Sequence, residues 1–326
     1  MAVYTQLGAE ALAEIVDAFG VGQLRSAKGI AEGVSNSNWL IETSGADGGG
    51  ARFILTMYEQ RVEVSDLPFF LGLLDHLADR GCPVPRTIHD TQGQAFRYYG
   101  GKALALIEFL PGVSVSAPTP AQALAVGGAL ARLHLAAADF TPQRANGLGP
   151  PAWRALARAC GTEGLTSIHL DLAALVEREL ALIARTWPAD LPRGIIHADL
   201  FPDNVLMLDD EVTGLIDFYF ACNDITAYDV AVTHAAWCFS ADGSRFDPAL
   251  SRALLAGYNA VRRLSPAERG ALPLLARGSA MRFLLTRAYD WMNTPAGALV
   301  TRKDPMAFAR RLEFYANPVN GAIFGI

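Results

Sequence analysis

The stretch that decides the fold is 195–220, IIHADLFPDNVLMLDDEVTGLIDFYF. Within it, the short apolar runs VLML and LIDF flank a polar turn, which is typical of a β-hairpin. A hairpin brings its two ends together. We therefore expect Asp199 and Asn204, just before the first strand, to converge with Asp217 near the end of the second strand.

These side chains have the chemistry that phosphoryl transfer needs. His197, Asp199 and Asn204 spell H-x-D-x-x-x-x-N, and Asp217 follows in I-D-F. Protein kinases use a loop carboxylate to accept the proton of the attacking hydroxyl, and an Asn and an Asp to hold Mg²⁺ on the triphosphate. Mg²⁺ prefers oxygen ligands and keeps several waters. We predict Asp199 as the catalytic base and Asn204 and Asp217 as metal ligands.

A simpler interpretation is a polar turn in which Asp and Asn serve turn chemistry. The motif alone is a weak pattern. However, an Asp inside an apolar strand is costly to bury unless a cation or hydrogen-bond donors satisfy it, so the hairpin and Asp217 favour phosphoryl transfer. Asp203, next to Asn204, is either a support for the metal ligands or a substrate-binding group.

Composition limits the classes of function. The chain has 326 residues and is 51% hydrophobic, which argues for one large or two moderate domains. A net charge of -6 and no basic run disfavour a nucleic-acid partner. The four scattered cysteines indicate reduced thiols. Without a basic n-region or an uncharged apolar span, we expect a cytoplasmic protein with no membrane partner.

The break Leu110-Pro111-Gly112 divides two kinds of sequence pattern. Before it, we predict helices 5–19 and 66–80, the second capped by Asp66, and strands 39–43, 52–58 and 102–109. After it, we predict helices 120–138, 153–159, 170–187, 224–239, 248–262, 265–291 and 304–315, and a loose tail after Asn317. The expected fold is α+β, with an antiparallel-sheet nucleotide-binding lobe (1–110) and a larger, mainly helical catalytic lobe (111–326).

The polar, glycine-bearing loop before the strand at 39–43 is a candidate nucleotide site. In a kinase such a loop covers the ATP phosphates with backbone N–H groups and small polar side chains. Ser35, Asn36 and Asn38 have this chemistry. Any hairpin loop has a similar composition. The loop alone is therefore weak evidence for a nucleotide site, and the H-x-D-x-x-x-x-N motif is needed to support it.

Several charged residues lie in predicted helices. His134 and Asp229 are interpreted as buried structural groups, because a buried helical Asp must find donors. Arg277, Arg282 and Arg287 stand in the otherwise apolar segment RGSAMRFLLTRAYDW. They form either an exposed face with ion pairs or a grip on a carboxylate or phosphate, whose geometry matches the guanidinium fork.

The segments KGIAEGVSNSN, FILTMYEQRV, IIHADLFPDNVLML and GLIDFYFACND together resemble the kinase-like superfamily of aminoglycoside phosphotransferases and choline kinases. The segments at 66–70, 218–224 and 282–291 resemble its bacterial homoserine kinase branch. The resemblance implies two lobes with ATP in the cleft and a hinge at 107–110, so that Glu108 and Leu110 contact adenine. It implies Mg-ATP-dependent phosphorylation of the L-homoserine hydroxyl, a step toward threonine. It also implies that Asp229 supports the active-site loop.

Such a substrate is a zwitterion, whose ammonium needs a carboxylate and whose carboxylate needs an arginine. Asp203 or Asp224 is the candidate for the first, and Arg282 or Arg287 for the second. One alternative is a kinase of the same fold for choline, an aminoglycoside or a sugar derivative. An aromatic cage for choline would come from Tyr219, Phe220 and Trp237.

One position departs from the superfamily pattern. Thr56 stands where a strand Lys or Arg usually holds the α- and β-phosphates. Either Lys28 or Arg61 substitutes for it, or phosphate binding relies on Mg²⁺ and backbone amides. Thr56 is also the sole support for a third alternative, a nucleotide-binding module without catalysis.

Overall fold

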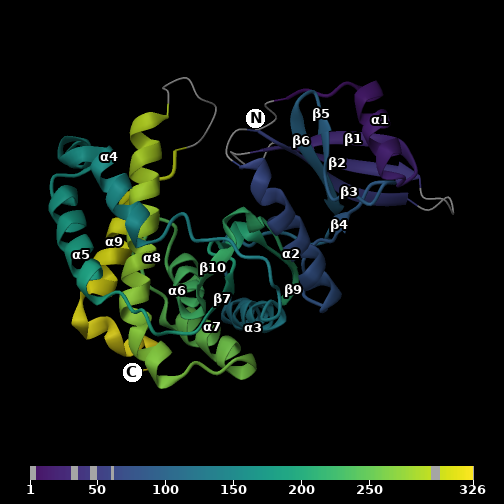
Figure 1. The fold of residues 1–326 in the computed structure, drawn as a ribbon. Coiled ribbons are helices and arrows are strands. Elements are labelled where there is room, and N and C mark those ends of the chain that lie inside the picture. The colour runs from purple at the N-terminus through teal and green to yellow at the C-terminus, as the bar shows by residue number, and fades with distance from the viewer. Residues whose placement is uncertain (1–4, 31–35, 45–49, 60–61, 295–301, 326) are drawn as a thin grey trace. The chain divides into compact units, whose positions relative to one another are not determined.

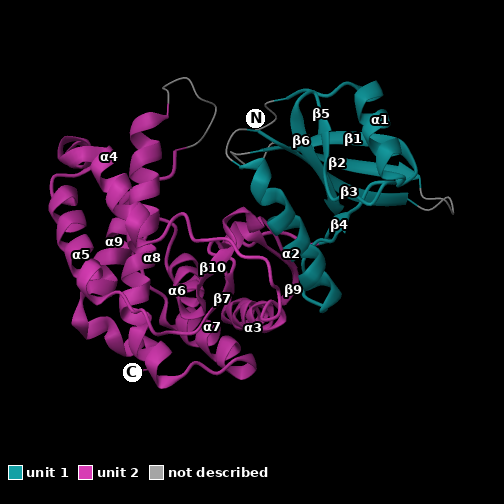
Figure 2. Cartoon of the chain, viewed as in Figure 1, with its two compact units in different colours: residues 1–111 teal, residues 112–326 magenta. Residues whose placement is uncertain are grey.

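The computed structural model describes residues 5–30, 36–44, 50–59, 62–294 and 302–325. The chain divides into two compact units, Met1–Pro111 and Gly112–Ile326, coloured separately in Figure 2. Unit 1 is built around an antiparallel sheet, and unit 2 is mostly helical. The predicted α+β class is therefore confirmed.

The sheet of unit 1 has strand order β1-β2-β3-β6-β4, with β5 also paired to β6, and every pair is antiparallel. Its strands are β1 (Gln23–Ile30), β2 (Asn36–Ser44), β3 (Gly50–Tyr58), β4 (Thr87–Ile88), β5 (Arg97–Tyr99) and β6 (Lys102–Glu108). The predictions at 39–43, 52–58 and 102–109 correspond to β2, β3 and β6. Sequence reasoning missed β1, because this edge strand is exposed along most of its length and lacks a buried alternation.

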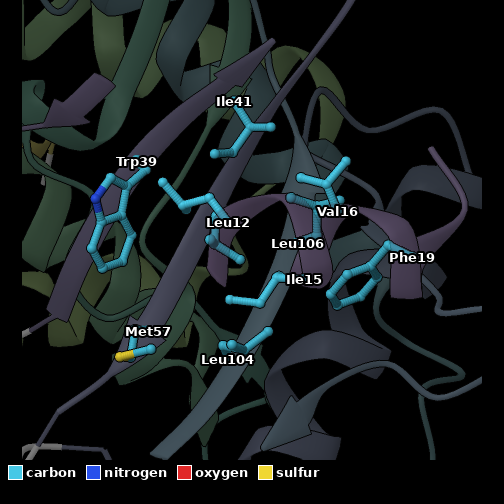
Figure 3. Close-up of a cluster of buried hydrophobic side chains, with 10 residues drawn as sticks. Leu12, Ile15, Val16, Phe19, Trp39, Ile41, Met57, Leu104 and Leu106 are labelled. Carbon is cyan, nitrogen blue, oxygen red and sulfur yellow. The ribbon is translucent and has the colours of Figure 1, made fainter. Parts of the chain in front are cut away.

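Helix α1 (Ala9–Phe19) covers one face of this sheet, as Figure 3 shows. The core that they share consists of Leu12, Ile15, Val16, Phe19, Trp39, Ile41, Leu55, Met57, Leu104 and Leu106. Because side chains alternate between the faces of a strand, Asn38 and Thr56 lie on the face opposite α1. The helix begins at Ala9 rather than at Thr5, and Gly20 ends it in a left-handed conformation (φ 64°).

Helix α2 (Leu67–Asp79) follows a 3-10 turn, Val64–Asp66. Asp66 occupies the predicted N-terminal position, but its side chain makes no capping hydrogen bond. The helix is tied to β4, since the Thr87 hydroxyl donates to the Leu71 carbonyl (3.0 Å) and the Thr87 N–H donates to the Asp75 carboxylate (3.0 Å).

Unit 2 contains helices and two small sheets (Figure 1). The helices are α3 (Pro120–Ala136), α4 (Pro150–Ile168), α5 (Leu172–Thr186), α6 (Thr226–Trp237), α7 (Pro248–Val261), α8 (Pro266–Asn293) and α9 (Met306–Ala316). The sheets pair β7 (Arg193–Ile196) with β10 (Cys222–Ile225) and β8 (Val205–Leu208) with β9 (Glu211–Leu215). Among the described residues, no helix is both long and apolar enough to cross a membrane.

Two helices of unit 2 begin at cap residues. Thr119 and Ser265 each form a complete capping box, at the start of α3 and α8 respectively. The prediction for 153–159 was too short, because α4 continues through a kink at Gly161 (φ 67°). Cys222–Ile225 is a strand rather than the start of a helix. The loose tail was also wrong for Pro318–Phe324, a 3-10 segment that buries Phe324.

Close backbone approach between α3 and α7 places two side chains that matter for the site. A Cβ at Gly127 would collide with the Leu254 carbonyl, and a Cβ at Gly257 would collide with the Leu124 carbonyl. Glycine is therefore required on both helices. The contact brings His134 of α3 within 2.8 Å of the Tyr258 hydroxyl of α7.

Candidate active site

The loop between β7 and β8 (197–204) carries the H-x-D-x-x-x-x-N motif. The Asn204 amide nitrogen donates to the Asp199 carbonyl (2.8 Å) and lies 3.3 Å from the Asp199 carboxylate. The Ile216 N–H donates to the Asn204 carbonyl (3.0 Å). The hairpin therefore aligns Asn204 with the residue that precedes Asp217, and the structure brings these three side chains to one place.

Asp217 lies outside the strand in which the sequence placed it. Strand β9 ends at Leu215, and Asp217 adopts a left-handed conformation (φ 64°, ψ 59°) before the 3-10 turn Phe218–Phe220. Asp tolerates this region better than most residues. The turn leaves Asp217 exposed, whereas its neighbours Leu215 and Phe218 are buried. The apolar run LIDF therefore correctly indicated that Leu215 and Phe218 lie in the core, but Asp217 between them does not.

The carboxylates interact electrostatically. Although Asp217 is exposed at the surface, the protein atoms around its carboxyl partly desolvate it, and this desolvation and the charges of Asp199 and Asp203 raise the pKa of Asp217 to about 7. Burial raises the pKa of Asp199, and the charges of Arg282 and His197 oppose that shift. A neighbouring negative charge disfavours the ionised form of a carboxyl, and a bound cation would favour it.

This donor set fits a divalent cation. The amide nitrogen of Asn204 is committed to Asp199, so its amide oxygen is the atom left for a metal. With the Asp217 carboxylate it provides the two hard oxygen ligands that Mg²⁺ takes from kinase-type sites.

Asp229 of α6 binds the backbone of the loop at 197–204. It is fully buried and accepts hydrogen bonds from the N–H groups of His197 (2.7 Å) and Ala198 (2.8 Å) and from His134 Nε2 (3.1 Å). Burial opposes ionisation, but the hydrogen bonds and charges of His134 and His197 outweigh it and lower the pKa of Asp229. Asp229 and His134 are buried structural groups, as the sequence indicated.

Arg282 of α8 holds the same loop from another side. Its guanidinium donates to the Ala198 carbonyl and lies 3.8 Å from the Asp199 carboxylate. Arg282 is only 2% exposed and stacks over Phe283. The structure does not present it to a ligand as the substrate prediction expected. Its apolar flanks, Met281 and Phe283, were the sequence signal for a buried arginine.

Asp224 is likewise engaged inside the fold. It is 6% exposed, and its oxygens accept hydrogen bonds from Asn146 (2.7 Å) and the Ile225 N–H (2.8 Å) and pair with Arg193 (2.9 Å). These contacts fix β10 beside β7. The substrate prediction missed this placement, because sequence reasoning put Asp224 at the start of a helix.

The other two substrate candidates, Asp203 and Arg287, interact electrostatically with Asp199. Asp203 is exposed and pairs with Lys303 (3.5 Å). Arg287 donates to the Asp304 carbonyl (3.2 Å) and stacks over Phe308. Desolvation lowers the pKa of Arg287, and the charges of Asp304, Asp199 and Asp203 oppose this shift.

Arg277, the third arginine of the segment, serves structure instead. It pairs with the buried carboxylate of Glu179 (2.6 Å) and so joins α8 to α5.

The nucleotide candidates of unit 1 are only partly described. Ser35 and Arg61 lie outside the described residues. The Asn38 side chain accepts a hydrogen bond from the Thr56 hydroxyl (2.8 Å), so this sheet face carries a neutral pair. Asn36 is buried near the Glu59 N–H (3.5 Å).

The proposed hinge follows β6. The Glu108 N–H donates to the Arg86 carbonyl (2.9 Å), and its carboxylate accepts from the Arg86 N–H (3.3 Å). Leu110 follows this strand and is half-buried. Lys28, one possible substitute for the strand cation, lies on the exposed edge strand β1.

Comparison with known proteins gives the class. The family profile described as "Phosphotransferase enzyme family" matches residues 26–264, and the chain belongs to this family. It is an ATP-dependent kinase.

Curated relatives with high identity over the full length are homoserine kinases. The chain is 52% identical to the homoserine kinase of Gluconacetobacter diazotrophicus, with 100% of each chain covered. It is 51% identical to the homoserine kinase of Azorhizobium caulinodans, covering 100% of this chain and 99% of the relative. The resemblance to the homoserine kinase branch is therefore confirmed.

Solved structures show the same fold at lower identity. An amicoumacin kinase has a TM-score of 0.71 at 14% identity, with 95% of this chain and 94% of that chain covered. A spectinomycin phosphotransferase has a TM-score of 0.70 at 14% identity, with 98% of each chain covered.

Proposed function

We propose that this chain transfers the γ-phosphoryl group of Mg-ATP to the side-chain hydroxyl of L-homoserine, giving O-phospho-L-homoserine for threonine synthesis in the cytoplasm. The observation that carries the chemistry is the meeting of Asp199, Asn204 and Asp217 at the β8–β9 hairpin. The choice of substrate is supported by the full-length relatives, which are homoserine kinases at about half identity.

Asp199 is the proposed base. It accepts the proton of the attacking hydroxyl as the new O–P bond forms and the bond to the β-phosphate oxygen breaks. Its raised pKa strengthens it as a base near neutral pH. Contacts from Arg282 and Asn204 fix its position, and positioning supplies much of the rate in phosphoryl transfer.

Asn204 and Asp217 are the proposed Mg²⁺ ligands. Once bound there, Mg²⁺ would neutralise charge on the β- and γ-phosphate oxygens. A pKa of about 7 keeps the Asp217 carboxyl partly protonated until a cation binds, and so avoids a permanent cluster of negative charge.

Residues 1–110 are the proposed nucleotide-binding lobe, and residues 111–326 the proposed catalytic lobe. Ser35, Asn36 and Asn38 are assigned to the phosphates, and the backbone of Glu108 and Leu110 to adenine. The Thr56–Asn38 pair is neutral, so the phosphate contacts of this unit rely on hydrogen bonds rather than on a strand cation.

For the substrate, Arg287 is proposed to hold the carboxylate and Asp203 the ammonium. Both lie within electrostatic range of Asp199. Arg282 and Asp224 are not assigned to the substrate, because both are buried: the Arg282 guanidinium donates to the Ala198 carbonyl, and the Asp224 carboxylate accepts from Asn146.

An assay of ADP release tests the function. We expect rapid ADP release with L-homoserine and at least about a hundredfold lower kcat/KM with L-serine, L-threonine or choline, because each differs in the reach of its hydroxyl or lacks a charged group. A rate with choline or an aminoglycoside and none with L-homoserine would replace the proposed substrate. ATP binding without ADP release on any alcohol would indicate a silent module.

The carboxylate assignment has a sharper test. 3-Aminopropan-1-ol is L-homoserine without its carboxylate. Arg287→Met should lower kcat/KM for L-homoserine by about 10–100-fold, the value of a charged hydrogen bond, and leave the slow rate on 3-aminopropan-1-ol unchanged. An equal loss on both alcohols would show that Arg287 acts only through the fold.

A further inference from the structure

Lysine is scarce in this chain, and one lysine lies at the catalytic carboxylates. The sequence has three lysines, Lys28, Lys102 and Lys303, among 27 lysines and arginines. Lys102 pairs with Glu59 and donates to the Thr5 hydroxyl (2.6 Å). It lies on the α1 face of the sheet, since it is two residues from the core residue Leu104. Lys303 has a different setting.

The Lys303 ammonium lies 3.5 Å from the Asp203 carboxylate. Its charge also reaches the carboxylates of Asp199 and Asp217, since it lowers the pKa of each against the upward shift from burial. Lys303 and Asp203 are both more than 60% exposed. An exposed ion pair of this kind contributes little to stability, so holding the fold together does not account for the position of Lys303.

The backbone on both sides of Lys303 is anchored. Arg302 donates to the Trp291 carbonyl (3.2 Å) and stacks over the Trp291 ring. Asp304 accepts the N–H of Met306 at the start of α9 (2.8 Å), and its carbonyl accepts from Arg287 (3.2 Å). These contacts hold the backbone of Lys303 near Asp203. The exposed ammonium can still exchange Asp203 for another partner.

Phosphoryl transfer is accelerated by positive groups beside the oxygens of the transferred phosphoryl group. Arg282 is buried against the Ala198 carbonyl and Asp199, and Arg287 is the residue proposed above for the substrate carboxylate. Among the described residues, Lys303 is the remaining cation whose charge acts on Asp199 and on Asp217. Lysine binds phosphate as a compact point charge that needs no fixed fork.

We propose that Lys303 is a catalytic residue that leaves Asp203 when ATP binds and contacts the oxygens of the transferred γ-phosphoryl group. It supplies a positive charge in a chain whose strand β3 carries the neutral Thr56. The exchange also frees the Asp203 carboxylate for the substrate ammonium. This inference depends on the proposed roles of Asp199 and Asp217, but it does not depend on which alcohol is the substrate.

The small number of lysines allows a direct mapping experiment. The probe is an acyl phosphate of ATP, which carries the acyl group on the γ-phosphate. A lysine amine beside that phosphate attacks the acyl carbonyl, an amide forms, the acyl C–O bond breaks, and ATP leaves while the amine loses a proton to water. After proteolysis, mass spectrometry distinguishes Lys303 from Lys28 and Lys102.

We expect acylation at Lys303 that excess Mg-ATP prevents. Acylation of Lys28 or Lys102 with Lys303 unmodified would overturn the proposal, and so would labelling of Lys303 that ATP does not prevent. Because the probe needs no acceptor alcohol, this outcome is independent of the test for L-homoserine.

Kinetics provides the second measurement. Lys303→Met should lower kcat by about 10–100-fold on L-homoserine and on 3-aminopropan-1-ol alike, and Lys303→Arg should recover part of the loss. Arg252→Met, at an exposed position on α7, is the matched control and should keep the wild-type kcat. Full activity of Lys303→Met, or a loss confined to L-homoserine, would contradict a contact with the phosphoryl group.

Discussion

Two polar regions of the molecule, the loop at 197–204 in unit 2 and the sheet face opposite α1 in unit 1, satisfy their hydrogen bonds in opposite ways. In unit 2, the loop at 197–204 is held by buried charges, with Asp229 on its N–H groups and Arg282 on a carbonyl. In unit 1, the sheet face opposite α1 carries the neutral pair of Thr56 and Asn38. The difference teaches that charged groups hold the motif loop of unit 2, whereas this sheet face of unit 1 carries a neutral hydrogen bond. Four variants or conditions test this division.

The largest effect is expected at the proposed base, Asp199. Asp199→Asn removes the proposed proton acceptor and should lower kcat by about 10²–10⁴-fold, while ATP binds with nearly unchanged affinity. ADP release measures the first and calorimetric titration with an ATP analogue measures the second. Asp190→Asn, at an exposed position, is the control with normal turnover. Normal turnover of Asp199→Asn would remove Asp199 from the mechanism.

A loss of stability is expected at Asp229. Asp229→Asn replaces a buried charge that accepts three hydrogen bonds and should cost about 3 kcal/mol of unfolding free energy, with a fall in kcat. The pKa of Asp229 is lowered in the fold, so its contribution is present above the ordinary Asp value and is lost as pH falls through the folded value. Urea titrations at pH 7 and at about pH 2, well below the ordinary Asp value of 3.8, should therefore show a smaller difference at the acid pH. An equal difference at both would contradict an ionised Asp229.

A pH effect on metal binding follows from Asp217. With a pKa of about 7, the carboxyl must lose its proton to bind a cation, so apparent Mn²⁺ affinity should fall by about tenfold for each pH unit below 7. In metal-free protein the same shift lowers stability as pH rises from 3.8 to about 7, and added Mg²⁺ should reverse this. Mn²⁺ titration followed by electron paramagnetic resonance measures the affinity. A pH-independent affinity in the wild type would exclude Asp217 as a ligand.

The smallest effect is expected at Thr56. Thr56→Val keeps the shape of the side chain but removes the hydrogen bond to Asn38, at a cost of about 1 kcal/mol. Because no charge is lost, kcat should change less than about fivefold. The lost hydrogen bond should instead raise the KM for ATP. Thr56→Ser restores the hydroxyl and should behave as wild type. A hundredfold loss of kcat in Thr56→Val would show that unit 1 contributes more to the chemistry than the comparison implies.

Sequence reasoning succeeded where the pattern was local. The hairpin, the capping boxes at Thr119 and Ser265 and the motif residues need only neighbouring positions to be recognised. It failed where partners are distant in the chain. Asp224 depends on Asn146 and Arg193, and no local pattern reports such contacts.

Two other differences have specific physical causes. The backbone of Asp217 turns left-handed after β9, so an apolar strand pattern placed it one element too early. The contact of Lys303 with Asp203 joins positions one hundred residues apart, and an isolated lysine in a polar segment carries no signal of its own. The nucleotide assignments in unit 1 stay predictions.

Ala198 has a consequence for how the enzyme matures. Its φ of 64° is costly for a residue with a Cβ, about 1–2 kcal/mol in a free chain. That geometry is held by Asp229 on one helix and Arg282 on another. A partly assembled chain in which these two helices are not yet packed lacks the contacts that fix the backbone next to Asp199. Catalytic competence should appear as the last event of refolding, after helical circular dichroism has recovered.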